Sequence, residues 1–172
     1  MRPRQPLPRL WLMTDERQGD GLLPAVARLP AGSGIVFRHY SLAEVARRDL
    51  FDRVKAAAPG LVLLAGPAAE ARAWGADGSH GRGRGAGLRS APVHDLAQIR
   101  AAERAGADLL FLSPAYATRS HEGARTLGLA RFAWLARRTP LPVIALGGMN
   151  AARGRRLASF GAYGWAAIDA WG

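Results

Sequence analysis

The chain has 172 residues, of which 49% are hydrophobic and 22% charged, a length that allows one domain with a sizeable core. It contains no cysteine, which excludes disulfides, thiolate metal sites and a cysteine nucleophile. The formal charge is +11, and only one of the 24 basic residues, Lys55, is not an arginine.

The apolar runs are too short to span a bilayer. Prolines interrupt the basic N-terminus where a signal peptide would carry its apolar run. We therefore expect a cytoplasmic protein with one domain over residues 1–172, in which residues 1–9 form a loose lead-in to the first strand.

The basic excess suits either nucleic acid or an anionic small molecule. The arginines are spread along the chain apart from a few pairs, and neither zinc-finger spacing nor an aromatic-glycine RNA signature is present. An arginine-rich surface is therefore favoured over a nucleic-acid footprint. A contiguous arginine face without carboxylates would favour the footprint instead.

Short apolar runs recur along the chain with helical patterns between them. Eight runs predict strands, at 10–13, 34–37, 61–66, 76–81, 88–93, 108–114, 142–148 and 163–168. The clearest helices are predicted at 42–57, 95–106, 129–138 and 150–161. Asp95 and Asn150 are expected as N-caps, and Gly106 and Gly161 as C-terminal stops.

This alternation predicts parallel strands joined by crossover helices. Eight such units would close into a (β/α)8 TIM barrel, which ordinarily takes about 200 residues or more. Several helices must therefore be short, and the segments after the first, third and fourth strands have too few residues or too many glycines for full helices. An open doubly wound sheet is the alternative.

The strand predicted at 142–148 ends in Gly147-Gly148, and a helical pattern starts near Met149. Glycines at the end of a strand allow close approach of a ligand, and the first N–H groups of a following helix point at the same place. The segment suits a phosphate, with a plain strand-to-helix turn as the alternative. On this interpretation Gly148→Asp abolishes phosphate binding and leaves the fold intact.

Several segments occur in the order found in one known family. They are WLMTD, IVFR, GADGSHG, the stretch from His94 to Gly123, PVIALGG and GAYGWAAIDA. The chain resembles thiamine-phosphate synthases and their TenI-type relatives, most densely from His94 to Gly148. The resemblance implies a (β/α)8 barrel of thiamine biosynthesis. It also implies a transferase that couples a hydroxymethylpyrimidine pyrophosphate to a thiazole phosphate, releases pyrophosphate, and uses Mg²⁺ to neutralise the leaving group.

The pyrophosphate and metal motifs of the family are only partly kept. Arg38 keeps the family arginine and could clamp a phosphate, with a salt bridge at the barrel mouth as the alternative. Ala65-Gly66 replaces the Asn-Asp pair whose carboxylate holds the metal, and no carboxylate follows His80 through Leu88. Because hard cations need oxygen ligands, we expect Mg²⁺ to bind weakly or not at all.

The loop after the sixth strand is better preserved. Thr118 and Ser120 keep two hydroxyls that could bind phosphate oxygens, and Arg119 adds a positive charge. His121 replaces the family lysine, so anion affinity is expected to rise as the pH falls towards 6. A solvated turn is the alternative.

Other family positions are mixed. Gly147 and Gly148 match the thiazole-phosphate site, whereas Asp169 replaces a serine and would repel a phosphate if it pointed inward, or could cap a last helix. His80 and His94 are candidate site residues, with structural hydrogen bonding as the alternative. Two hypotheses remain: an active synthase, or an impaired or regulatory family member that binds a thiazole phosphate. The expected partners are small phosphorylated substrates and a second copy of the chain, with neither membrane nor nucleic acid.

Overall fold

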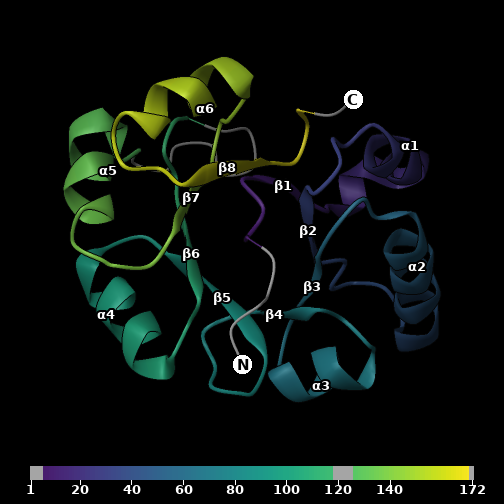
Figure 1. The fold of residues 1–172 in the computed structure, drawn as a ribbon. Helices are drawn as coiled ribbons and strands as arrows, with labels where there is room; N and C mark the ends of the chain where they lie inside the picture. Colours follow the sequence, from purple (N-terminus) through teal and green to yellow (C-terminus); the bar gives the residue numbers. More distant parts are fainter. Residues whose placement is uncertain (1–5, 118–125, 171–172) are drawn as a thin grey trace.

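The structure is a computed structural model that describes residues 6–117 and 126–170. Its eight parallel strands pair in chain order, and the last pairs with the first to close a barrel (Figure 1). They are β1 (Leu10–Met13), β2 (Gly34–Phe37), β3 (Val62–Ala65), β4 (Gly78–His80), β5 (Leu88–Val93), β6 (Leu109–Leu112), β7 (Val143–Ala145) and β8 (Gly164–Ala167). The predicted (β/α)8 barrel is confirmed, and the open sheet is excluded.

The helices surround the barrel and explain how so short a chain completes it. Four lie where helices were predicted: α2 (Glu44–Ala57), α4 (Leu96–Ala105), α5 (Gly128–Ala136) and α6 (Ala151–Ala158). Between β1 and β2 there is only a 3-10 turn, η1 (Glu16–Gly21), and a six-residue α1 (Leu22–Ala27). A six-residue α3 (Ala68–Ala73) follows β3, and β4 continues to β5 without a helix.

The expected helix ends are formed as local chemistry requires. The side chain of Asp95 accepts a hydrogen bond from the N–H of Gln98 at the start of α4. The side chain of Asn150 accepts one from the N–H of Arg153 at the start of α6. Gly106 ends α4 in the left-handed conformation, with φ +80°. Each cap satisfies a backbone group that the helix leaves unpaired.

The apolar residues form one cluster inside the barrel and two outside it. The inner cluster includes Trp11, whose ring meets Phe111 edge to face at 5.5 Å. A Cβ atom at Gly34 would lie 2.3 Å from the Trp11 ring, so the glycine leaves room for this side chain. One outer cluster lies between β1–β3 and α1–α3, and the other between β5–β8 and α4–α6. The outer layer is therefore divided at β4.

Polar contacts tie residues 7–9 to the barrel base. The Tyr163 hydroxyl donates to the carbonyl of Leu7 at 2.7 Å, and the Trp11 indole N–H donates to the carbonyl of Pro8 at 2.8 Å. The Arg9 guanidinium lies 4.6 Å from the centre of the Tyr163 ring. Within the described residues, no helix is both long and apolar enough to cross a membrane.

Candidate functional site

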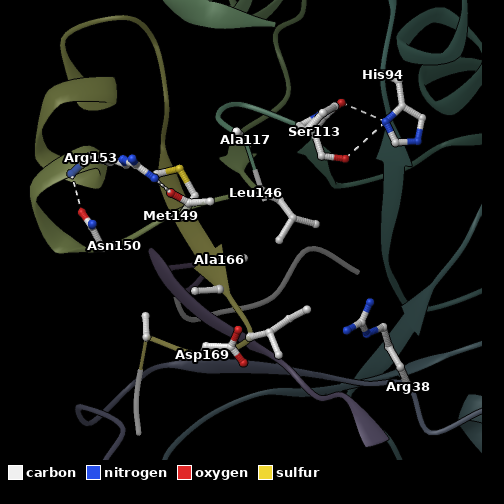
Figure 2. A pocket seen from close by; sticks show the side chains of 16 residues that line it. Arg38, His94, Ser113, Ala117, Leu146, Met149, Asn150, Arg153, Ala166 and Asp169 are labelled. Carbon is white, nitrogen blue, oxygen red and sulfur yellow. Dashed lines mark hydrogen bonds between the residues drawn. The ribbon is translucent and has the colours of Figure 1, made fainter. Parts of the chain in front are cut away.

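A pocket of about 590 Å³ opens at the carboxyl ends of the strands, where (β/α)8 barrels place their sites. Its walls come from Arg38 after β2, His94 after β5, Ser113 after β6, the segment 146–150 after β7 and residues 168–170 after β8. Figure 2 shows these side chains reaching in from the separate elements.

The glycine pair after β7 has a packing reason of its own. Gly147 has φ +97° and Gly148 has φ +58°, conformations that other residues rarely adopt. A Cβ at Gly147 would lie 2.9 Å from Pro114, and one at Gly148 would lie 2.2 Å from the carbonyl oxygen of Ala117. The expectation that Gly148→Asp leaves the fold intact is therefore wrong, because any side chain there displaces the backbone after β6.

Backbone donors gather where this glycine pair meets α6. Within the described residues, the N–H groups of Gly148 and Met149 donate to no backbone carbonyl. At the start of α6 the Arg153 N–H is capped by Asn150, while those of Ala151 and Ala152 donate to no backbone carbonyl of the described residues. Since Gly148, Met149 and Asn150 all line the pocket, the site presents backbone donors and the positive end of a helix dipole to an anion.

Arg153 adds a full positive charge to these donors, and sequence reasoning missed it. It lines the pocket, donates a hydrogen bond through Nη1 to the carbonyl of Gly148, and lies with its guanidinium 4.7 Å from the centre of the Tyr116 ring. Its place three residues after the N-cap Asn150 puts it in the first turn of α6. That position beside a phosphate-type glycine pair was the signal available in the sequence.

Arg38 forms the expected salt bridge at the barrel mouth, and its role as a phosphate clamp stays a prediction. Its Nε donates to the carbonyl of Thr14 at 2.7 Å, and its Nη2 pairs with Asp15 at 3.0 Å, which forms a salt bridge at the barrel mouth. The side chain also lines the pocket. Burial lowers the pKa of the Arg38 guanidinium, but an arginine stays charged at any physiological pH. Arg38 is thus a positive charge held in place by the two residues that follow β1.

The two candidate histidines occupy different environments. His94 lines the pocket, and its Nδ1 lies 2.8 Å from the carbonyl oxygen of Ser113. A carbonyl only accepts, so Nδ1 carries the proton, and Nε2 is an acceptor in the neutral ring. His80 instead is buried, with Nδ1 2.8 Å from the Ser90 hydroxyl and its ring edge-on to Phe111. Burial lowers the pKa of His80 to about 4, so it is neutral at pH 7.

Of the remaining predicted site residues, the structure describes Asp169 but not the four in the loop after β6. Asp169 lines the pocket, and its charge helps to raise the pKa of Arg17 after the larger effects of Asp15. No helix follows β8 within the described residues, so Asp169 caps none there. Thr118, Arg119, Ser120 and His121 lie outside the described residues, and their role stays a prediction.

The carboxylates near the mouth do not fit a magnesium site. Asp15 is paired with Arg17 and Arg38, and the hydrogen bond from Arg17 lowers the pKa of its carboxyl. Glu70, which lies next to Gly66, is paired with Arg47 at 2.7 Å. Over residues 6–117 and 126–170 no three His, Asp or Glu side chains gather as metal ligands. Carboxylates held by arginines are poor ligands for a hard cation.

Comparison with known proteins gives partial sequence matches. Residues 90–171 match the family model described as thiamine monophosphate synthase. A putative thiamine-phosphate synthase 2 of Aquifex aeolicus (strain VF5) is 36% identical over 77 residues, which cover 45% of this chain and 41% of that protein. A thiamine-phosphate synthase of Pyrococcus furiosus is 34% identical over 80 residues, or 46% and 39% of the two chains. The match thus spans about two fifths of these relatives.

Solved structures extend the likeness in fold to nearly the whole chain. A thiamine phosphate pyrophosphorylase from Pyrococcus furiosus superposes with a TM-score of 0.76 and 21% identity, over 93% of this chain and 85% of that one. A structure described as native KDPGal superposes with a TM-score of 0.65 and 15% identity, over 97% and 85%. At these identities the likeness shows the fold alone. Residues 90–171 are therefore similar to the thiamine-phosphate synthase and TenI family, and the likeness over the rest of the chain is one of fold.

Proposed function

We propose that the protein is a thiamine-phosphate synthase-type transferase, which couples a hydroxymethylpyrimidine pyrophosphate to a thiazole phosphate. The observation that carries the proposal is the anion cradle at the end of β7. There, the N–H groups of Gly148 and Met149, which have no backbone acceptor among the described residues, the start of α6 and the Arg153 guanidinium line one pocket. The cradle lies in the half of the chain that matches the family model.

The pocket offers separate positive charges for the two substrates. The β7–α6 cradle with Arg153 suits the phosphate of the thiazole substrate. Arg38 belongs to another wall, after β2, and suits the pyrophosphate leaving group (Figure 2). Because Thr14 and Asp15, which follow β1, fix the Arg38 side chain, its charge is oriented before the substrate arrives, which is how a site stabilises charge that develops in a transition state.

The proposed reaction breaks one bond and forms another. The C–O bond between the pyrimidine methylene carbon and pyrophosphate breaks, and pyrophosphate leaves with the electron pair. The lone pair of the thiazole nitrogen then forms the new C–N bond to the cationic methylene carbon. In this scheme Arg38 neutralises the departing anion, while the Nε2 acceptor of His94 orients the pyrimidine.

Replacing Arg153 tests the cradle. Arg153→Gln should raise the KM for thiazole phosphate about tenfold, since a hydrogen bond to a charged group contributes about 1.5–3 kcal/mol. Arg155→Gln removes the same charge from an exposed position two residues away, and should change the KM less than twofold. The assay measures pyrophosphate release that requires both substrates. Phosphate binding without any release would favour the non-catalytic family member, and equal effects of the two variants would remove Arg153 from the cradle.

Magnesium should contribute little through this protein. Titration of Mg²⁺ into the protein with pyrophosphate present is expected to give no heat beyond that of Mg²⁺ and pyrophosphate alone, because Asp15 and Glu70 at the mouth are held by arginines. The matched measurement uses Glu70→Gln, which should leave the heats unchanged. A protein-dependent heat that Glu70→Gln or Asp15→Asn abolishes would contradict the expectation.

A further inference from the structure

The outer wall of the barrel at α5 and α6 has an unusual distribution of charge. Residues 126–168 contain six arginines and no aspartate, glutamate or lysine. One of them, Arg153, belongs to the pocket. The other five are exposed, as is the aromatic residue Trp134. We call the five with Trp134 the α5–α6 arginine face: Arg131, Trp134, Arg137, Arg138, Arg155 and Arg156.

The members of this face come together on two neighbouring helices. Arg131, Trp134 and Arg138 follow the spacing i, i+3, i+7, which places them along one side of α5 and its C-terminal turn. The Arg138 guanidinium lies 3.6 Å from the centre of the Trp134 ring. Arg155 and Arg156 are in the last turn of α6. Figure 1 shows α5 and α6 side by side. After α6 the chain passes next to α5, where a Cβ at Gly161 would lie 3.3 Å from the Cβ of Ala136.

The charges of this face have no carboxylate partner within residues 6–117 and 126–170. Among the described residues, no carboxylate forms an ion pair with any of its five arginines. The wall formed by α2 and α3 differs, because three of its five cations pair with carboxylates, in Arg47–Glu70, Arg48–Asp52 and Lys55–Asp77. Arginines near a helix C-terminus interact favourably with the negative end of the helix dipole. That effect explains their place on the helices but neither the missing carboxylates nor an exposed tryptophan.

We propose that the α5–α6 arginine face binds single-stranded nucleic acid. Arginine binds phosphate through a planar fork of donors and is preferred in nucleic-acid recognition. Aromatic side chains flanked by positive charge are the platforms on which unpaired bases stack, and stacking is tolerant of sequence. Trp134 is 46% exposed, and only a strand with unpaired bases can offer it a base. The proposal goes beyond the transferase activity, because the face is separate from the pocket.

Two matched double variants test the face with a fluorescein-labelled, mixed-sequence oligonucleotide of about 12 nucleotides. Arg155→Gln/Arg156→Gln removes two charges from the face. Arg53→Gln/Arg72→Gln removes two exposed charges from α2 and α3. Fluorescence anisotropy at 50 mM salt should show about tenfold weaker binding for the first variant and less than a twofold change for the second. The slope of log K against log salt should flatten by about 1.4 in the first variant, since each phosphate contact on a single strand contributes about 0.7.

A third variant, Trp134→Leu, tests the stacking. It should weaken single-strand binding at least fivefold and remove the quenching of tryptophan emission that the oligonucleotide causes. A duplex of the same length should bind more weakly and should not respond to Trp134→Leu.

Three results would overturn the proposal. The first is equal weakening by the two double variants, which would mean that only net charge matters. The second is duplex binding as tight as single-strand binding, with no effect of Trp134→Leu. The third is binding to phosphatidylserine vesicles that depends on the face, without binding to the oligonucleotide. Both double variants should keep wild-type pyrophosphate release, so a failure here is distinguishable from a failure of the proposed transferase activity.

Discussion

Gly148→Ala is expected to lower the free energy of unfolding by about 2–5 kcal/mol, from two separate costs. The first is the left-handed backbone conformation, φ +58°, which costs an alanine about 1–2 kcal/mol. The second is the new Cβ, 2.2 Å from the carbonyl oxygen of Ala117, which forces a backbone shift of the kind that overpacking causes, about 1–3 kcal/mol. Ligand binding should weaken as well, because the shift moves the wall of the pocket.

Gly75→Ala separates these two costs. Gly75 has φ +71°, and a Cβ there would meet no atom within 4 Å, so only the conformational cost applies. Urea unfolding of both variants should therefore show the larger loss for Gly148→Ala, and calorimetry with thiazole phosphate should show weakened binding for that variant alone. Equal losses in the two variants would mean that the segment after β6 yields freely and that the glycine pair is not needed for its packing.

Acidification from pH 7 to 4.5 is expected to destabilise the protein through His80. The folded pKa of about 4 lies below the ordinary 6.5, so the unfolded chain takes up the proton first. The stability that the neutral ring contributes is present above pH 6.5 and is lost as the pH falls towards 4, to a total of about 3 kcal/mol. Burial of the ring among apolar side chains is the main cause, and the nearby Arg38 charge adds to it.

The variant His80→Asn tests whether His80 causes this pH dependence of stability. Asparagine cannot titrate and can keep a hydrogen bond to the Ser90 hydroxyl, although it fills less space beside Phe111. The variant should therefore be less stable at pH 7 but lose less stability between pH 7 and 4.5. His94→Asn, at the exposed rim of the pocket, is the matched control and should lose as much as the unaltered protein. Burial also lowers the pKa of His39, so some dependence should remain in His80→Asn; a full wild-type loss would contradict the assignment.

The sequence predicted the barrel well because the signals for strands and helix ends are local. Each apolar run between turn residues became a strand, and Asp95 and Asn150 became caps. The site was predicted less completely. Gly147 and Gly148 were found by their type, but their contacts with Pro114 and Ala117 join segments more than thirty residues apart. Sequence spacing cannot show such contacts.

Arg38 and Arg153 are two charged residues of the site that the sequence analysis placed incompletely. The sequence offered a phosphate clamp or a salt bridge for Arg38, and only the approach of β1 to β2 shows that Asp15 pairs with it while the side chain still lines the pocket. Arg153 is one of 23 arginines, so composition gave no reason to single it out. Its distinction is the position in the first turn of α6, which follows from the predicted N-cap Asn150, so this residue could have been found from the sequence.

The division of the outer apolar layer at β4 has an evolutionary consequence. Because α1–α3 and α4–α6 pack in separate clusters, a substitution beneath one set of helices need not be compensated beneath the other, and the two halves can diverge at different rates. The family match begins at residue 90, just after this division. The second half contains the glycine pair Gly147-Gly148 and Arg153, and the first half contains Arg38 and Ala65-Gly66. Separate packing of the two half-barrels therefore allows one part of the barrel mouth to change in sequence while the other is kept.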